Sequence, residues 1–289
     1  MCVFTAGIVN AHTLHVENKT FALSQTKYTT PSLAFGVGNE VWYAPLARVF
    51  INDSLHLRVG STTYSVINCA EGFVDTENYT YDENGRLIGA DENLWAQNKS
   101  YAYIDTGFTA NGNTRIKTKF YNTSSGAKWF FGSRMAKNYR AFALQCPGNN
   151  YSVRNDYGNL VPNITGTNCG AIGIFVVDKN KGNTTLIAPN GLTYTNNNST
   201  TNFTISKTTT IFGANTEAGV QTNTNKFYYF KIYSDGADEN TLVRDMVPVP
   251  ACMRIGDFIV PENGMWDIVE QKFYGNANAT GTIIYGKDK

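Results

Sequence analysis

This sequence has few histidines, few charged residues and no long helical pattern. Only 16% of the 289 residues are charged and the net charge is +1, so the chain has no basic excess with which to bind nucleic acid. The three histidines, His12, His15 and His56, all lie in the N-terminal part. No GxSxG, HExxH or P-loop motif occurs, so no familiar catalytic motif is present.

Long apolar runs are also missing. No stretch approaches the roughly 18 consecutive apolar residues that a membrane-spanning helix needs, so no membrane association is expected. The N-terminus, MCVFTAGIVNAHTLHVENK, has no basic segment ahead of its short apolar run and does not resemble a secretory signal. With Met1 as the start, we expect a protein that is made in a cytoplasm and leaves it, if at all, by a route such as lysis.

Cysteine is scarce and scattered. The five cysteines are Cys2, Cys69, Cys146, Cys169 and Cys252. No CxxC pair occurs, which argues against a structural zinc site. We expect free buried thiols, as in most cytosolic proteins, with a Cys146–Cys169 bridge as the alternative. His12 and His15 are no better as metal ligands, because in extended chain residues i and i+3 point to opposite faces.

Aromatic and small polar residues are abundant instead. Tyr and Phe number 17 each, and Asn, Thr, Ser and Gly suit turns and strands better than helices. The stretch 226–249, KFYYFKIYSDGADENTLVRDMVPV, joins an aromatic run to a turn sequence and then to an apolar alternation that Pro248 and Pro250 end. This pattern predicts a buried hairpin whose partner strands lie elsewhere in the chain.

Strand patterns punctuated by turn residues divide the chain into three parts. Residues 1–32 indicate an N-terminal arm. Residues 33–90 indicate a small β module, with a turn at 36–39 (GVGN) and an alternation of Leu55, Leu57 and Val59 that is typical of a half-buried strand. Residues 91–289 indicate a larger β domain.

Within the larger domain, strands are predicted at 115–120, 128–134, 140–145 and 171–177, with two or three more in 184–211. No helical period longer than about two turns occurs. The predicted fold class is therefore all-β: a two-sheet antiparallel jelly-roll sandwich with a smaller N-terminal β region.

Four pieces of sequence, in order, carry a resemblance to a known domain type. They are 103–107 (YIDTG) ahead of a TRIK strand, 129–134 (WFFGSR), 227–233 (FYYFKIY) followed by 242–245 (LVRD), and 264–269 (GMWDIV) followed by Phe273 and Tyr274. Residues 101–289 resemble the concanavalin A-like, laminin-G-like jelly-roll domain of gut bacteriophage virion proteins and gut bacterial surface proteins. Residues 33–46 resemble a short β module that precedes such domains in phage structural proteins.

The resemblance implies a sandwich of about twelve to fourteen strands in two antiparallel sheets, with ligands at the concave face or the loop rim. It implies no chemistry, because this fold carries lectins, hydrolases and purely structural proteins alike.

Paired carboxylates are the first candidates for chemistry, since glycosidases use two of them about 5 Å apart when retaining. Asp235, Asp238 and Glu239 lie in a predicted turn, and Asp267 and Glu270 face opposite sides of a strand. Neither set is flanked by the aromatic residues of a sugar cleft. In the resemblance, Asp245 and Asp267 occupy motif positions where they satisfy loop amides or pair with Arg244. We predict no catalytic residue and no enzyme, and keep a glycan hydrolase as the third hypothesis.

A sugar-binding site needs a stacking aromatic ring beside planar hydrogen-bonding groups. The candidate ligand-binding residues lie on two predicted strand ends joined by one loop, and are Trp129, Arg134, Asn138, Tyr139 and Arg140. The alternative places Trp129 in the core and the others in a solvated loop.

No cofactor is expected, and calcium is the alternative. Thr80, Asp82, Asn84, Gly85 and Asp91 fall on ligand positions of a calcium loop, although a Thr in the first position and the lack of flanking helices weaken the match. A plain turn is the preferred interpretation.

The leading hypothesis is a non-enzymatic structural protein of a bacteriophage virion: a capsid decoration, head fibre or tail-associated adhesin. Residues 1–90 would bind other virion proteins, the sandwich would face outward and bind host or mucosal glycans, and the chain would form a homo-oligomer. It would be made in the host bacterial cytoplasm and reside in the virion. The alternative is a carbohydrate-binding adhesin module on the surface of a gut bacterium.

Overall fold

Where the structure describes the chain, its regular elements are almost entirely β-strands. The computed structural model describes residues 13–16, 19–22, 32–37, 40–45, 55–59, 62–66, 72–136, 139–198, 202–236, 238–278 and 280–289; of the first six ranges and of Tyr139 it describes only the backbone. These ranges contain no α-helix, so the predicted all-β fold class is confirmed. Nothing helical in them has the length and hydropathy of a membrane span.

The chain forms two compact units. The smaller comprises residues 1–74 and 251–261, and the larger comprises residues 75–250 and 262–289. The predicted boundary near residue 90 lies within the first segment of the larger unit.

The smaller unit is built from antiparallel hairpins. They are β1 (Thr13–Val16) with β2 (Lys19–Ala22), β3 (Ser32–Val37) with β4 (Glu40–Pro45), β5 (Leu55–Val59) with β6 (Thr62–Val66), and β24 (Arg254–Ile255) with β25 (Phe258–Ile259). The strands predicted on either side of 36–39 and at Leu55 are confirmed. A bridge between Phe73 and Met253, with Arg254 N donating to Phe73 O at 2.7 Å, joins the two segments of this unit.

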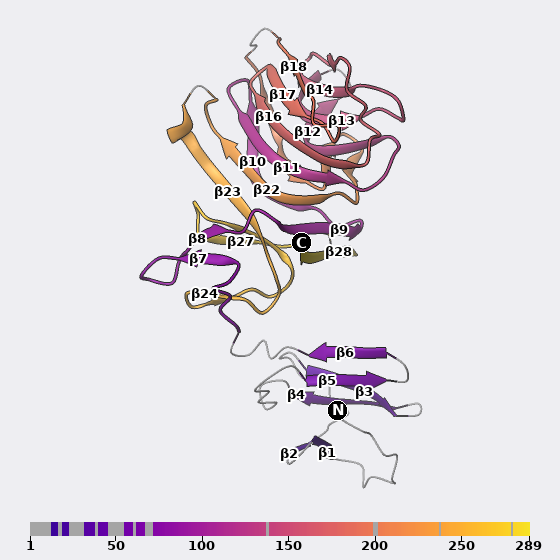
Figure 1. The fold of residues 1–289 in the computed structure, drawn as a ribbon, viewed down its shortest axis with the longest axis vertical. Helices are drawn as coiled ribbons and strands as arrows, with labels where there is room; N and C mark the ends of the chain where they lie inside the picture. Colours follow the sequence, from indigo (N-terminus) through magenta and orange to yellow (C-terminus); the bar gives the residue numbers. More distant parts are fainter. Residues whose placement is uncertain are drawn as a thin grey trace. The chain divides into compact units, whose positions relative to one another are not determined.

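The larger unit contains a ten-stranded sheet whose main path runs β18-β17-β16-β11-β22-β23-β26-β27, with β9 joining β22 to β28. Its strands are β9 (Leu94–Ser100), β11 (Arg115–Asn122), β16 (Gly173–Asn180), β17 (Asn183–Ile187), β18 (Thr193–Asn196), β22 (Lys226–Tyr233), β23 (Leu242–Val249), β26 (Gly264–Asp267), β27 (Lys272–Tyr274) and β28 (Thr282–Lys287). Figure 1 shows β16, β11 and β22 side by side as long curved strands.

A six-stranded sheet packs against it in the order β15-β14-β13-β12-β20-β21. Its strands are β12 (Lys128–Ala136), β13 (Tyr139–Cys146), β14 (Val153–Gly158), β15 (Asn163–Ile164), β20 (Gly213–Thr216) and β21 (Gly219–Thr222). Two further pairs are β10 (Ile104–Asn111) with β19 (Thr204–Ile211), and β7 (Tyr79–Tyr81) with β8 (Leu87–Ala90). The two large sheets form the predicted sandwich.

One pairing departs from the two antiparallel sheets that the resemblance implies. Strands β12 and β20 run parallel, with Phe131 opposite Gly213 and Ser133 opposite Asn215. Gly132, within the 129–134 motif, has a φ of +124°, and a Cβ there would lie 2.3 Å from the carbonyl oxygen of Phe142. Only glycine can occupy this position without displacing β13.

Phenylalanine rings from both sheets fill the space between them. The ring of Phe120 on β11 lies 4.8 Å from that of Phe130 on β12, and 5.3 Å from those of Phe175 and Phe227 on the flanking strands. All four side chains are fully buried. Their buried apolar area is the main force that holds the sheets together.

The hairpin predicted at 226–249 is confirmed as β22 and β23. Between its strands, Glu239–Thr241 form a 3₁₀ turn capped by the side chain of Asp238. Of the two prolines predicted to end the second strand, Pro248 lies within β23, and the strand ends at Val249, immediately before Pro250. The pairing of β22 with β23 stops at Met246, and beyond it β23 pairs only with β26. Pro248 has no N–H to donate, but no hydrogen bond to β22 is lost, because β22 does not pair with this part of β23.

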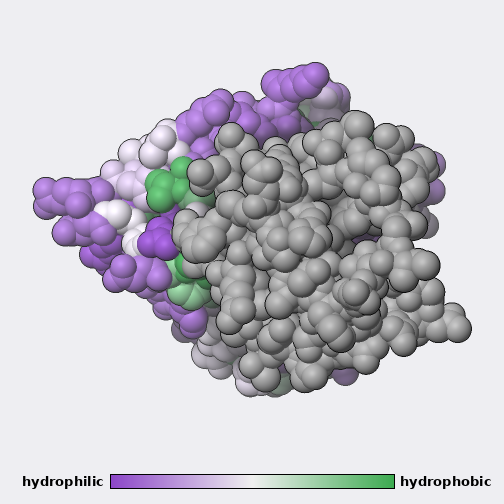
Figure 2. Space-filling view, turned by 90° about the horizontal axis from the view of Figure 1, so that it is seen from below, coloured by the Kyte–Doolittle hydropathy of each residue, from purple (hydrophilic) through white to green (hydrophobic). Residues whose placement is uncertain are grey.

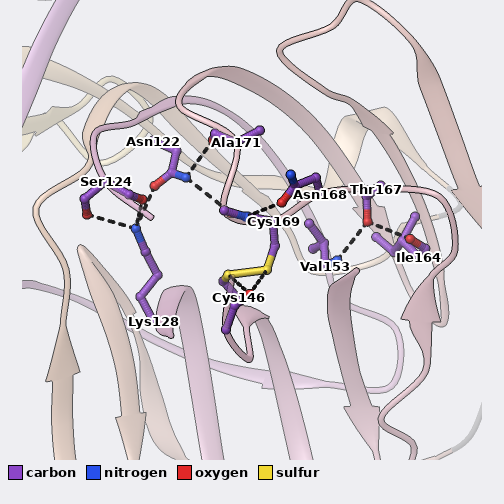
Figure 3. The surroundings of a disulfide bond; sticks show 12 residues. Asn122, Ser124, Lys128, Cys146, Val153, Ile164, Thr167, Asn168, Cys169 and Ala171 are labelled. Carbon is purple, nitrogen blue, oxygen red and sulfur yellow. Dashed lines mark hydrogen bonds between the residues drawn. A yellow bond between two sulfur atoms is a disulfide. The ribbon is translucent and has the colours of Figure 1, made fainter. Parts of the chain in front are cut away.

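Cys146 and Cys169 form a disulfide that spans 23 residues of sequence, and Cys252 is disulfide-bonded as well. The expectation of free thiols is therefore wrong for these three residues. Figure 3 shows the bridge beside the Asn122 side chain, whose Nδ2 donates to the carbonyl oxygens of Cys169 and Ala171 at 3.2 and 2.8 Å. Because Asn122 lies at the end of β11, these bonds hold the loop ahead of β16 against the ten-stranded sheet.

The described residues visible on one face of the molecule are mostly polar (Figure 2). In Figure 2, the coloured residues are mostly hydrophilic, and hydrophobic ones occupy small areas. Such a surface suits a β-protein exposed to solvent or to hydrated ligands.

Replacing Phe120 by alanine tests the inter-sheet core. We expect Phe120→Ala to lower the free energy of unfolding by about 3–5 kcal/mol, because it leaves a cavity among three other rings. The exposed Tyr151→Ala, at 62% exposure, should change it by less than about 0.5 kcal/mol. Urea denaturation followed by circular dichroism measures both, and equal losses would show that Phe120 is not central to the core.

Candidate functional site

Of the five predicted ligand-binding residues, Trp129 and Arg134 lie on β12, and Tyr139 and Arg140 lie on β13. Asn138 is outside the described residues, and so is the side chain of Tyr139. The structure places Trp129, Arg134 and Arg140 in two different surroundings: the first two form one cluster, and Arg140 lines a hollow.

Trp129 and Arg134 contact each other along β12. The guanidinium carbon of Arg134 lies 4.6 Å from the centre of the Trp129 ring, which is a cation–π arrangement. Two nitrogens of the same guanidinium donate to the two carboxylate oxygens of Glu217 at 2.8 and 3.0 Å. Arg134 therefore occupies one face of the indole ring, and a sugar stacking on that face would have to displace it.

Arg140 lies at the rim of the sandwich, where a hollow of about 420 Å³ opens. The lining residues come from the β10–β11 turn, the start of β13 and the start of β19, and are Asn111, Gly112, Asn113, Arg140, Asn202, Phe203 and Thr204. Arg140 has a φ of +44°, an uncommon backbone conformation for a residue other than glycine. Its backbone N–H donates to Oδ1 of Asn159 at 3.1 Å.

Hydrogen bonds and a ring contact connect the segments that line this hollow. The hydroxyl of the buried Tyr157 donates to Gly112 O at 2.7 Å, and Gly112 N donates to Phe203 O at 3.1 Å. The Phe203 ring packs edge-to-face on Tyr157 with centres 4.9 Å apart. The hollow thus combines a guanidinium, three side-chain amides and an aromatic ring, a composition suited to polyhydroxylated ligands.

The acidic turn after β22 is held by basic side chains. Glu239 contacts Arg115 and Lys117 at 2.5 and 2.8 Å, and its hydrogen bond from Lys117 lowers the pKa of the Glu239 carboxyl. Asp235 pairs with Lys181 at 3.2 Å. These ion pairs tie the turn after β22 to β11 and to Lys181, which follows β16.

Asp267 and Glu270 are likewise engaged with structural partners. Asp267 is fully buried, and its Oδ1 accepts the backbone N–H groups of Asp245 and Val269 at 2.9 and 3.0 Å. Burial raises the pKa of the Asp267 carboxyl. Arg244 lies 3.5 Å from Asp267 and 2.5 Å from Glu270. Satisfying loop amides and pairing with Arg244 are the roles that the resemblance implied for Asp267.

The predicted calcium-loop positions fall on the β7–β8 hairpin. Asp82 accepts the backbone N–H groups of Asn84 and Arg86 at 2.9 and 2.8 Å, and Asp91 pairs with Lys287 at 2.8 Å. Where the structure describes the chain, no group of three or more His, Cys, Asp or Glu side chains is placed to hold a metal ion.

Two parts of the hollow were absent from the predicted site: the turn at Asn111–Asn113 and the segment at Asn202–Thr204. Each has a sequence feature that could have identified it. NGN is a strong turn sequence, and Phe203 is an isolated aromatic residue in a tract of Asn, Ser and Thr. No protein-family model matches the chain, and no curated protein matches it either.

Removing the Asp267 carboxylate tests its structural role. We expect Asp267→Ala to lower the free energy of unfolding by about 1–3 kcal/mol, because two backbone amides lose a buried acceptor. Glu83→Ala, at an exposed turn position, should change it by less than about 0.5 kcal/mol. Thermal unfolding of the two variants makes the comparison, and an unchanged stability for Asp267→Ala would contradict the structural role.

Proposed function

We propose that the protein is a non-enzymatic structural protein of a bacteriophage virion that displays its sandwich outward and binds glycans at the rim hollow. In this proposal residues 1–90 attach the chain to other virion proteins, and the protein acts as a homo-oligomer. The virion assignment is supported by the ordered resemblance over residues 101–289, and the all-β sandwich is compatible with it.

The observation that supports glycan binding best is the composition of the hollow. Asn113 and Asn202 line the hollow with amides that can both donate and accept hydrogen bonds, as sugar hydroxyls require, whereas Oδ1 of Asn111 already accepts the backbone N–H of Asn113 at 2.8 Å. Phe203 supplies an apolar surface for the carbon-bearing face of a sugar ring. The guanidinium of Arg140 favours a glycan that carries a carboxylate, because Arg binds carboxylates with paired hydrogen bonds.

The disulfides are in keeping with a protein displayed outside a cell. Disulfides persist in oxidising surroundings such as the virion surface and are rare in a reducing cytoplasm. The Cys146–Cys169 bond would then form after release of the particle. This feature favours both the virion surface and the bacterial surface, which is the alternative location.

Glycan binding is tested with the full chain on an array of bacterial and mucosal glycans. We expect binding to acidic glycans that weakens about 10- to 100-fold in Arg140→Ala, since a hydrogen bond to a charged group contributes roughly 1.5–3 kcal/mol. Arg86→Ala, which removes an exposed arginine on the β7–β8 loop, should bind like the unaltered protein. Binding that is equal in both variants, or absent altogether, would show that the hollow is not a glycan-binding site.

The virion assignment is tested by quantitative mass spectrometry of purified phage particles. We expect the protein at a fixed copy number that matches a symmetric position in the particle, since virion assembly is symmetric. A protein encoded within a longer chain with a secretory signal or a sortase tail would instead establish the bacterial surface alternative. Release of reducing sugars by the folded protein would support the hydrolase, and activity that survives both Asp235→Asn and Asp267→Asn would exclude these carboxylates as its catalytic acids.

A further inference from the structure

A lysine lies fully buried between the two sheets. Lys179 is on β16 of the ten-stranded sheet and has no exposed surface. Its Nζ lies 4.4 Å from the ring centre of Phe142 and 5.7 Å from that of Tyr157, both on the six-stranded sheet. Lysines are almost never buried without a charged partner, yet Lys179 takes part in none of the ion pairs between described residues.

The polar group against Nζ is the carboxamide of Asn155. Asn155 is on β14 of the six-stranded sheet and is also fully buried, and Nζ donates to its Oδ1. The contact therefore links the two sheets. Its members are 24 residues apart in the sequence.

The carboxamide is held in place from its other side. Its Nδ2 donates to Gly182 O at 3.2 Å and to Oδ1 of Asn196 at 3.1 Å. The backbone of Asn155 is fixed as well, since its N–H donates to Pro162 O at 2.9 Å. Asn155 thus presents its side chain to Lys179 in one orientation, and such fixed orientation of two reactants lowers the barrier to a reaction between them.

The surroundings also favour the uncharged amine. Burial lowers the pKa of Lys179 to about 7, and the negative charge of Asp156 opposes this shift. A large share of the side chain is therefore neutral near pH 7, and a neutral amine in an apolar pocket is a nucleophile. Alternation along β14 directs Asp156 to the face opposite Asn155, where it accepts a hydrogen bond from Gln145 at 2.8 Å.

We propose that Lys179 and Asn155 form an intramolecular isopeptide bond that joins the two sheets. The neutral Nζ attacks Cγ of Asn155, and a bond forms between them. One proton moves from Nζ to Nδ2, the bond between Cγ and Nδ2 breaks, and Nδ2 leaves as ammonia. The products are a secondary amide and one ammonia molecule. No oxidant, metal or external reactant is required.

A second lysine–asparagine contact serves as an internal comparison. Lys207 Nζ lies 3.5 Å from Oδ1 of Asn215, but Lys207 is half-exposed. Water competes with the amide for this Nζ, and the contact lacks the apolar enclosure between the two sheets that surrounds the buried pair. Only the buried pair is expected to react.

The bond is tested by mass spectrometry of the reduced and denatured full chain. We expect a mass lower than that of the sequence by one ammonia molecule. Trypsin cleaves after Arg154 but should not cleave after a linked Lys179, so residues 155–181 should appear as one peptide that lacks one ammonia. Chymotrypsin, which cuts after Tyr157 and Phe175, should leave two segments joined through Asn155 and Lys179.

Two variants test whether the loss of ammonia comes from Lys179 and Asn155. Lys179→Met and Asn155→Ala should each restore the full sequence mass expected for that variant, whereas Lys207→Met should still lack one ammonia. Cyclisation of another asparagine would give the same mass loss, but it would persist in Lys179→Met and give no linked peptide. The proposal is overturned if the unaltered, folded protein has its full sequence mass and trypsin cleaves after Lys179. This result can be read without any variant, so a variant that fails to fold does not affect the conclusion.

Discussion

Contact between phenylalanine rings across the sandwich is the interaction on which the rest of the structure depends. Phe120 from one sheet and Phe130 from the other pack within a group of four buried rings. Backbone hydrogen bonds hold each sheet together but exert no force between sheets, so apolar burial must set their spacing. That spacing also determines how closely the polar groups of the two sheets approach each other, including Lys179 and Asn155.

Local pattern was sufficient to predict much of the fold. Aromatic and alternating stretches located β11, β12, β13 and the hairpin of β22 and β23, because a half-buried strand repeats every two residues. The parallel pairing of β12 with β20 has no such signal. It depends on segments about eighty residues apart whose register is set by packing in the finished core, and single-sequence patterns do not encode that information. The Cys146–Cys169 disulfide could be named only as an alternative to free thiols, because spacing alone does not show whether two cysteines lie close together.

Local sequence pattern was also insufficient to predict the whole candidate site. Sequence reasoning sought a site within one loop and its two flanking strands, and it named Arg140, which lines the hollow. The hollow beside Arg140 depends on the pairing of β10 with β19, which brings Asn111 opposite Thr204. The carboxylates were easier to interpret, because the resemblance supplied a structural role for Asp267 that the hydrogen bonds support.

The interruption of the larger unit by residues 251–261 has a consequence for inheritance. The chain passes between the two units three times, after residues 74, 250 and 261. A gene exchange with one crossover near the first junction would transfer residues 1–74 without the segment that carries Met253, the bridge partner of Phe73. The two units are therefore expected to evolve as one cassette, unlike the serial modules that can be exchanged at a single linker.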